Sequence, residues 1–174
     1  MIEMLSEKLA ITIKKANENE TASVEVMKFS LILLFNMFFT ILLSLILAAL
    51  FGTVRETVLA LFSFMLLRIF SGGFHFKTAT ACTVASVAIV VIVPLIPITD
   101  QIAFYLTLAA LILVLKFAPS NIRGTVRIPE KYFPFLKIIS ALIVSSNFLL
   151  SNHLLALIFF VQAVSLISKK EVLA

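Results

Sequence analysis

The chain has 174 residues, of which 61% are hydrophobic and 13% are charged. Soluble domains carry about 25% charged residues, so this chain has too few polar side chains to cover a surface exposed to water. The composition therefore excludes a soluble globular protein, and the net charge of +5 is better explained by membrane topology than by binding of nucleic acid. We expect an all-α polytopic membrane protein in which residues 1–174 form a single integral-membrane domain.

The first segment, residues 1–20, is predicted to form an amphipathic helix. Ile2, Leu5, Leu9 and Ile13 recur at spacings of three and four residues, with charged residues between them. Because these charges interrupt the apolar run, the segment does not have the pattern of a signal peptide. Such a helix can lie in the membrane interface, or it can pack on the protein with one face toward solvent.

About six apolar segments follow and predict a transmembrane bundle over residues 27–170. The first is long enough to cross a hydrocarbon core of about 30 Å, whereas the second is shorter and could be tilted or re-entrant. Pro94 and Pro97 predict a kink or an end of the helix near the close of the third segment. The segments are residues 27–51, 54–70, 79–98, 101–118, 133–150 and 153–168.

The basic residues predict which loops face the cytoplasm. With six spans and both termini in the cytoplasm, 13 of the 14 lysines and arginines fall on the cytoplasmic side, and Arg55 is the exception. Cytoplasmic loops are enriched in basic residues, so this distribution supports that orientation. It places residues 71–78 and 119–132 on the cytoplasmic side, and Asp100 and His153 on the outer side.

Reactive side chains gather in one stretch, RIFSGGFHFKTATAC, at residues 68–82. It contains the single cysteine of the chain and one of its two histidines. A thiol becomes a nucleophile when a neighbouring base or a positive field favours the thiolate, and His75 is the candidate base on the same side of the membrane as Cys82. A zinc site needs three or four ligands together, so we expect no metal and no cofactor.

The spacing of His75 and Cys82 requires the chain to bend between them. In one continuous helix the two side chains would lie about 10 Å apart along the axis, which is too far for a hydrogen bond. Gly72 and Gly73 permit a bend, and Thr78 is a suitable N-cap for the next helix. Cys82 would then lie near the first turn of that helix, where the helix dipole favours a thiolate.

Each of these residues also has a simpler structural explanation. Cys82 can be a small apolar filler, His75 a hydrogen-bonded loop residue, and the glycine pair an ordinary turn between helices. Arg68 is costly within an apolar helix unless it reaches the interface or finds a partner. It could instead hold a carboxylate or carbonyl of a substrate.

The same residues resemble the accessory gene regulator B (AgrB) family of bacterial membrane peptidases. The shared pattern is R-x3-G-G-x-H-x6-C, which begins at Arg68 and ends at Cys82. A second shared pattern is K-F-A-P at residues 116–119, followed by a basic loop. The order of the spans and the amphipathic N-terminus also fit, so the resemblance covers nearly the whole chain.

The resemblance implies a cysteine endopeptidase of the bacterial cell membrane that acts on its cytoplasmic side. Cys82 would attack a propeptide of the AgrD type, with His75 as general base and then acid, and would keep the rest of the peptide as a thioester. Closure of a thiolactone or lactone ring then gives a quorum-sensing peptide. The family also implies a homodimer in contact with membrane lipid. The residues expected to bind substrate are Arg68, Gly72, Gly73, Lys77, Arg123, Arg127 and Lys131.

Other functions remain open on the sequence. The basic residues can reflect membrane topology alone. The chain could be a non-enzymatic component of a peptide exporter or a partner of a sensor, in which Cys82 is filler, or an inactive family member. The sequence identifies no third catalytic residue.

Overall fold

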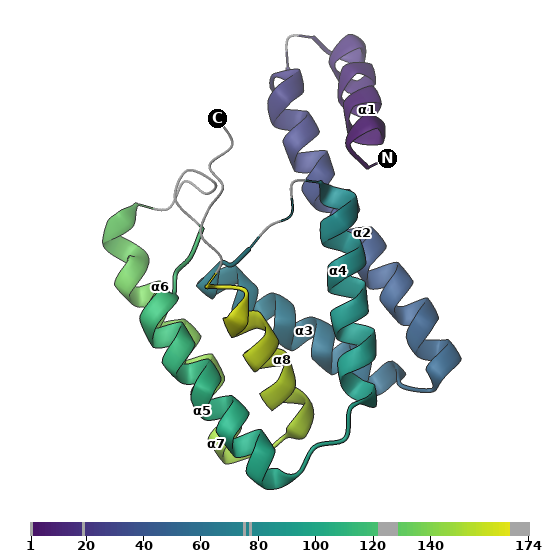
Figure 1. The fold of residues 1–174 in the computed structure, drawn as a ribbon. Coiled ribbons are helices and arrows are strands. Elements are labelled where there is room, and N and C mark those ends of the chain that lie inside the picture. The colour runs from purple at the N-terminus through teal and green to yellow at the C-terminus, as the bar shows by residue number, and fades with distance from the viewer. Residues whose placement is uncertain (1, 19, 75, 77, 122–128, 168–174) are drawn as a thin grey trace.

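Helices are the regular secondary structure of the part of the chain that the structure describes. A computed structural model describes every residue except 1, 19, 75, 77, 122–128 and 168–174, and the described residues form no β-strand (Figure 1). The all-α class expected from the sequence is confirmed. The elements are α1 (Ile2–Ala16), α2 (Val24–Phe51), α3 (Val54–Ser71), α4 (Ala79–Ile92), η1 (Val93–Leu95), α5 (Asp100–Phe117), η2 (Glu130–Tyr132), α6 (Phe133–Ser145), α7 (Asn147–Leu150) and α8 (His153–Val164).

Helices occupy the positions of all six predicted spans. Three helical segments are long and apolar enough to cross a membrane, and two shorter apolar helices accompany them. The chain is therefore a membrane protein, while the number of complete crossings stays a prediction. The long segments are Val24–Phe51, Asp100–Phe117 and Glu130–Leu150, and the shorter ones are Ala79–Leu95 and His153–Val164.

The third predicted span ends earlier than its apolar composition indicates. The α-helix α4 stops at Ile92, and a 3-10 turn with Pro94 in its centre follows. Proline has no amide hydrogen to donate to the carbonyl four residues before it, so the α-helix does not continue through this position. The predicted end of the helix near Pro94 is confirmed.

The N-terminal helix packs on the protein and keeps one apolar stripe uncovered. Ile2, Ser6 and Ala10 are buried against the structure, at one turn's spacing along α1. The adjacent stripe, which includes Leu5 and Leu9, stays 46% and 37% exposed. Helix α1 therefore packs on the protein. That its exposed apolar stripe lies in the membrane interface stays a prediction.

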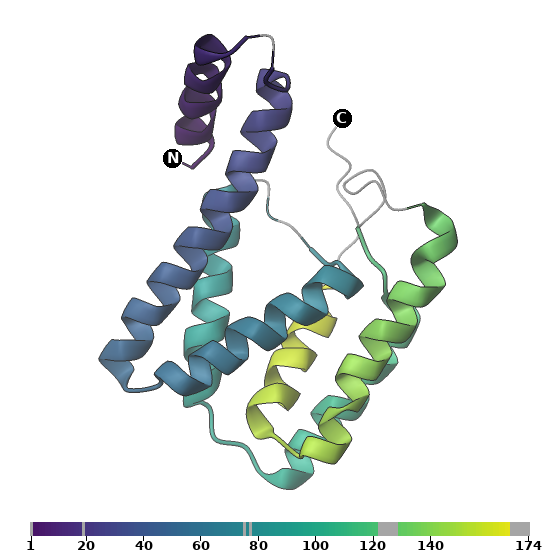
Figure 2. The same cartoon turned by 180° about the vertical axis from the view of Figure 1, so that it is seen from behind.

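The helices form two groups joined by α3. Helix α4 lies along α2, while α5, α6 and α8 pack together, and α3 runs obliquely between the groups in both views (Figures 1 and 2). Leu67, Val90, Val114 and Ile158 come from four different helices and are fully buried in the shared core. This packing brings the C-terminal ends of α3, α5 and α8 together at the loop that leads into α4.

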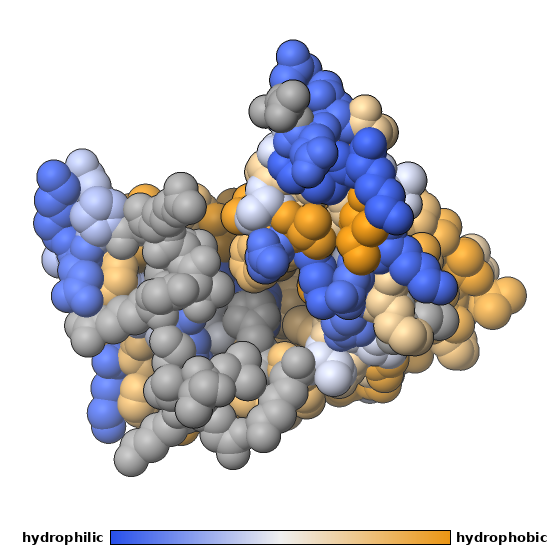
Figure 3. All heavy atoms as spheres, turned by 90° about the horizontal axis from the view of Figure 1, so that it is seen from above, coloured by the Kyte–Doolittle hydropathy of each residue, from blue (hydrophilic) through white to orange (hydrophobic). Residues whose placement is uncertain are grey.

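The end of the molecule near α1 is rich in hydrophilic residues. Figure 3 looks down on this end, where hydrophilic residues gather, while hydrophobic residues cover the flanks of the helices. An apolar flank with a polar end is the surface expected of a helical bundle in a bilayer. The start of α4 is the end of that helix nearer α1 (Figure 1), and Cys82 lies in its first turns.

Candidate active site

Cys82 lies near the start of α4, as the sequence predicts. The Thr78 side chain accepts a hydrogen bond from the amide of Ala81 at 3.2 Å, and the Cys82 amide donates to the Thr78 carbonyl at 3.2 Å. Thr78 is therefore the N-cap, and Cys82 follows within the first turn or so. The thiol is half-buried and lies near the positive end of the helix dipole.

A carboxylate from α1 closes the same helix start. Glu3 Oε1 accepts a hydrogen bond from the amide of Ala79 at 2.7 Å. Hydrogen bonds from its own backbone amide and from that of Ala79 lower the pKa of the Glu3 carboxyl below its usual 4.5. The charge stabilises the start of α4, because it lies at the positive end of the helix dipole. No pattern in the sequence indicates this contact, because Glu3 and Ala79 lie 76 residues apart.

A polar contact with α2 fixes the rotation of α4. The hydroxyl of Thr83 donates to Asn36 Oδ1 at 2.6 Å, and the Thr83 side chain is only 3% exposed. Successive residues of a helix point about 100° apart, so Cys82 points to a different side of α4 from the one that Thr83 turns to α2. The contact therefore sets the direction in which the thiol points.

The glycine pair forms the bend that the sequence predicts. Helix α3 ends at Ser71, and Gly72 and Gly73 follow with φ angles of 70° and 133°. Such angles favour glycine over every other residue. A Cβ atom on Gly73 would also lie 2.7 Å from Ser165 Oγ and 3.2 Å from Gln162 Nε2. The pair therefore serves both the turn and a close approach of α8.

The two residues that follow the K-F-A-P segment, Ser120 and Asn121, lie directly beside the glycine pair. The amide of Gly73 donates to the Ser120 carbonyl at 3.0 Å, and the amide of Ser120 donates to the Ser71 carbonyl at 2.9 Å. The Asn121 side chain donates to the Gly73 carbonyl at 3.4 Å. The glycine pair and the residue after K-F-A-P, far apart in the sequence, thus form one short pairing of backbones.

Gln162 of α8 holds the glycine pair from the other side. Its side chain is fully buried, and its Nε2 donates to the Gly72 carbonyl at 2.7 Å. Its Oε1 accepts from Arg68 Nη1 at 3.3 Å. The backbone of α8 adds a further bond, since the Ser165 carbonyl accepts from the amide of Phe74 at 3.0 Å. In the sequence, Gln162 is a polar residue within an apolar helix, which indicates that it has a buried polar partner but does not indicate which residue that is.

Arg68 is paired within the protein. Its guanidinium donates to Gln162 and to the Phe74 carbonyl, and it lies 5.7 Å from the centroid of the Phe64 ring. The partners offset the cost of a charge in an apolar helix. A thiolate at Cys82 is within electrostatic range of this guanidinium. Arg68 therefore holds the loop through the Phe74 carbonyl and places a positive charge near Cys82.

Of the five remaining predicted site residues, the structure describes Lys131. His75, Lys77, Arg123 and Arg127 lie outside the described residues. Lys131 lies in η2, with its amino group 5.1 Å from the centroid of the Tyr132 ring. Figures 1 and 2 place the start of α6, and η2 before it, on the side of the molecule away from α4. The structure thus groups Arg68 with the glycine pair and places Lys131 elsewhere.

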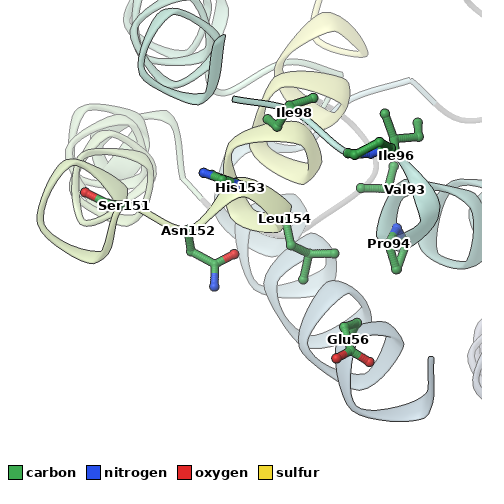
Figure 4. Close-up of a pocket in the computed structure, with 10 residues that line it drawn as sticks. Glu56, Val93, Pro94, Ile96, Ile98, Ser151, Asn152, His153 and Leu154 are labelled. Atoms are coloured by element: carbon green, nitrogen blue, oxygen red, sulfur yellow. The ribbon is translucent and has the colours of Figure 1, made fainter. Parts of the chain in front are cut away.

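The second histidine lies at the other end of the bundle. His153 Nε2 and Asp100 Oδ1 are 2.6 Å apart. His153 also lines a cavity of about 520 Å³ together with Val93, Pro94 and Glu56 (Figure 4). Since Val93 follows Cys82 by eleven residues, this cavity is about 16 Å away from it along α4. His153 therefore cannot act as a base for Cys82.

Within the described ranges, no group of three or more histidine, cysteine, aspartate or glutamate side chains is placed to hold a metal ion. Among the described residues, the groups that carry chemistry at the site are the Cys82 thiol and the Arg68 guanidinium. These groups suit nucleophilic attack on a carbonyl and stabilisation of negative charge.

Comparison with known proteins gives the same family that the sequence motifs resemble. The chain matches the model of the family described as Accessory gene regulator B over residues 6–170. A protein of Halalkalibacterium halodurans described as AgrB-like is 32% identical over 120 residues, which are 68% of this chain and 61% of the relative. The match thus spans less than two thirds of that relative's length. No solved structure matches the chain.

Proposed function

This chain belongs to the accessory gene regulator B family, and on that premise we propose that it is a membrane-embedded cysteine endopeptidase. Its substrate is a propeptide of the AgrD type, from which it removes the C-terminal tail. One observation carries the proposal: Cys82, the single cysteine, lies at the capped start of α4. The loop Gly72–Phe74, which leads to His75, is held by hydrogen bonds from α3, α8 and the segment after α5.

The reaction proceeds through a thioester. The Cys82 thiolate attacks the carbonyl at the cleavage site, a sulfur–carbon bond forms, and the carbon–nitrogen bond to the tail breaks. His75 takes the thiol proton and delivers it to the departing amine. An internal thiol or hydroxyl of the bound peptide then attacks the thioester, which closes a thiolactone or lactone ring and returns the proton to Cys82 through His75.

Three features of the described residues support this chemistry. Cys82 lies near the positive end of the α4 dipole, and the guanidinium of Arg68 interacts electrostatically with it. The apolar flanks limit water near the thioester, which favours ring closure over hydrolysis. His153 is held at the far end of the bundle, so His75 is the histidine left to serve as base.

The orientation and partners follow from the charge distribution. We place both termini and the site on the cytoplasmic side of the cell membrane, because the basic residues concentrate there. The same charges attract an acidic propeptide tail, with Lys77, Arg123, Arg127 and Lys131 as its contacts. The working form is a homodimer in lipid, as is expected for this family.

A cleavage assay tests the proposal. The full chain is purified in lipid and given a propeptide of the AgrD type, and the products are identified by mass spectrometry. We expect a released tail and an adduct on Cys82 in the wild type, both lost in Cys82→Ala, with no tail released by His75→Ala. The matched control is His153→Gln, which removes the other histidine and is expected to cleave normally.

Cleavage by Cys82→Ala at the wild-type rate would show that the catalytic assignment is wrong. Cleavage by His75→Ala together with loss in His153→Gln would move the base to the other end of the bundle. A cell-based assay tests the alternative function. If Cys82→Ala and His75→Ala cells still export the peptide or signal as wild-type cells do, the chain is a non-enzymatic exporter component or sensor partner.

A further inference from the structure

The three residues before His75 have every backbone polar group hydrogen-bonded. The backbone groups of loops are usually exposed and hydrogen-bond to water. A loop whose backbone groups are all hydrogen-bonded to protein groups is therefore held in one defined conformation. Six backbone groups are involved, three amides and three carbonyls. Their partners are Arg68 O and Gln162 Nε2 for Gly72, Ser120 O and Asn121 Nδ2 for Gly73, and Ser165 O and Arg68 Nη2 for Phe74.

Gln162 connects two of the groups that hold this loop. A primary amide offers a donor and an acceptor in fixed geometry. The Gln162 donor reaches the Gly72 carbonyl at 2.7 Å, and its acceptor reaches Arg68 Nη1 at 3.3 Å. Arg68 in turn donates to the Phe74 carbonyl. One side chain of α8 therefore fixes both the beginning and the end of the loop.

An amide at this place has no other evident use. Gln162 is fully buried on a helix whose neighbouring residues are apolar, and a leucine would fill a similar volume without any polar group to satisfy. Its hydrogen bonds go to Ser71 Oγ, Gly72 and Arg68, all at the loop. The contacts of Gln162 are therefore those of a group that holds the loop in position.

We propose that Gln162 is a positioning residue of the peptidase: it holds the loop Gly72–Phe74 and Arg68 in the arrangement that presents His75 to Cys82. The inference rests on the proposed function. It assigns a role in the site to α8, the helix that is farthest from the Cys/His motif in the sequence. The donor and the acceptor of Gln162 are both required, because each fixes a different end of the loop.

The test uses Gln162→Leu and a matched control. Asn147 is also a buried amide, and it joins helices at the opposite end of the bundle, where its Nδ2 donates to Thr107 Oγ1 at 3.0 Å. Asn147→Leu therefore removes the same kind of contact away from the site. Thermal unfolding of the full chain in detergent measures the structural cost of each variant.

Two readouts separate positioning from structure. The first is the pH profile of alkylation by iodoacetamide, which reports on Cys82 alone because the chain has one cysteine. The second is the split between kcat and KM for propeptide cleavage. For Gln162→Leu we expect kcat to fall about tenfold or more with KM within about twofold, and an alkylation profile that moves toward that of His75→Ala. Asn147→Leu should keep both readouts near the wild type.

Gln162→Glu gives an independent test if Gln162→Leu does not fold. A carboxylate keeps the acceptor for Arg68 but cannot donate to the Gly72 carbonyl, so we expect a folded protein with a reduced kcat. Wild-type kcat in either folded variant, or equal loss in Asn147→Leu, would overturn the inference.

Failure of the proposed function looks different. If His75→Ala leaves the alkylation profile of Cys82 unchanged and Cys82→Ala still cleaves, then the peptidase assignment itself is wrong. If both variants behave as proposed and Gln162→Leu does not differ from the wild type, only the positioning role is wrong.

Discussion

Replacing Gly73 by alanine should damage the protein more than the same change at Gly52. Both glycines have positive φ angles, 133° and 69°. At Gly52 nothing lies within 4 Å of the new Cβ, so the cost is the backbone conformation alone, about 1–2 kcal/mol. At Gly73 the backbone costs about 1–3 kcal/mol. The Cβ placed 2.7 Å from Ser165 Oγ adds about 1–3 kcal/mol of overpacking.

The central values are about 4 kcal/mol for Gly73→Ala and about 1.5 kcal/mol for Gly52→Ala. A difference of about 2.5 kcal/mol corresponds to roughly 5–10 °C in Tm for a chain of this size. Thermal unfolding of the full chain in detergent measures it. Propeptide cleavage should fall in Gly73→Ala and persist in Gly52→Ala at a temperature where both variants are folded.

A second substitution tests the physical reason. Ser165→Ala removes the hydroxyl that the new Cβ would contact, and the nearest remaining atom is then Gln162 Nε2 at 3.2 Å. The double variant Gly73→Ala with Ser165→Ala should therefore recover about 1 kcal/mol or more of the loss, as an interaction energy in a double-mutant cycle. Equal Tm values for Gly73→Ala and Gly52→Ala, or no recovery in the double variant, would refute the reasoning.

Three further predictions concern the groups around this loop. The Glu3 pKa is lowered in the folded state, so the contact of Glu3 with Ala79 stabilises the protein above about pH 4.5 and is lost as the pH falls below that value. Hydrogen exchange at the start of α4 should therefore increase below about pH 4.5, and Glu3→Gln should abolish this pH dependence. Thr83→Val should lower the free energy of unfolding by about 1–3 kcal/mol in a denaturant titration, because Asn36 loses its 2.6 Å partner. Arg68→Lys should lower kcat about tenfold in a folded protein, because an ammonium group cannot reach Gln162 and Phe74 with the geometry of a planar guanidinium; wild-type turnover would contradict this.

The local features of the site could be predicted from the sequence. Thr78 as N-cap, the position of Cys82 near the start of the helix and the bend at Gly72 and Gly73 all depend on residues within a few positions of one another. Short-range hydrogen bonds and backbone preferences decide such features, so the sequence indicates them directly. The break near Pro94 was predictable for the same reason, since proline lacks an amide hydrogen.

Composition determined the class of the protein and the approximate place of its helices. An apolar chain must satisfy its backbone hydrogen bonds internally, and helices do this without help from distant segments. The ends of the spans were less predictable. The predicted fifth span, residues 133–150, is divided between α6 and α7 by a turn at Ser146, where the polar residues Ser145, Ser146 and Asn147 interrupt the apolar sequence.

Only the tertiary structure decided which residues hold the loop before His75. Gln162 lies 90 residues from Gly72, and Ser120 lies 47 residues from Gly73, so no spacing rule connects them. They meet because α3, α5 and α8 pack with their C-terminal ends together, and this packing depends on the shapes of buried side chains along whole helices. By itself the sequence determined a helical membrane protein with a capped cysteine and a flexible bend. The convergence of three helix ends decided that the bend is held in one conformation.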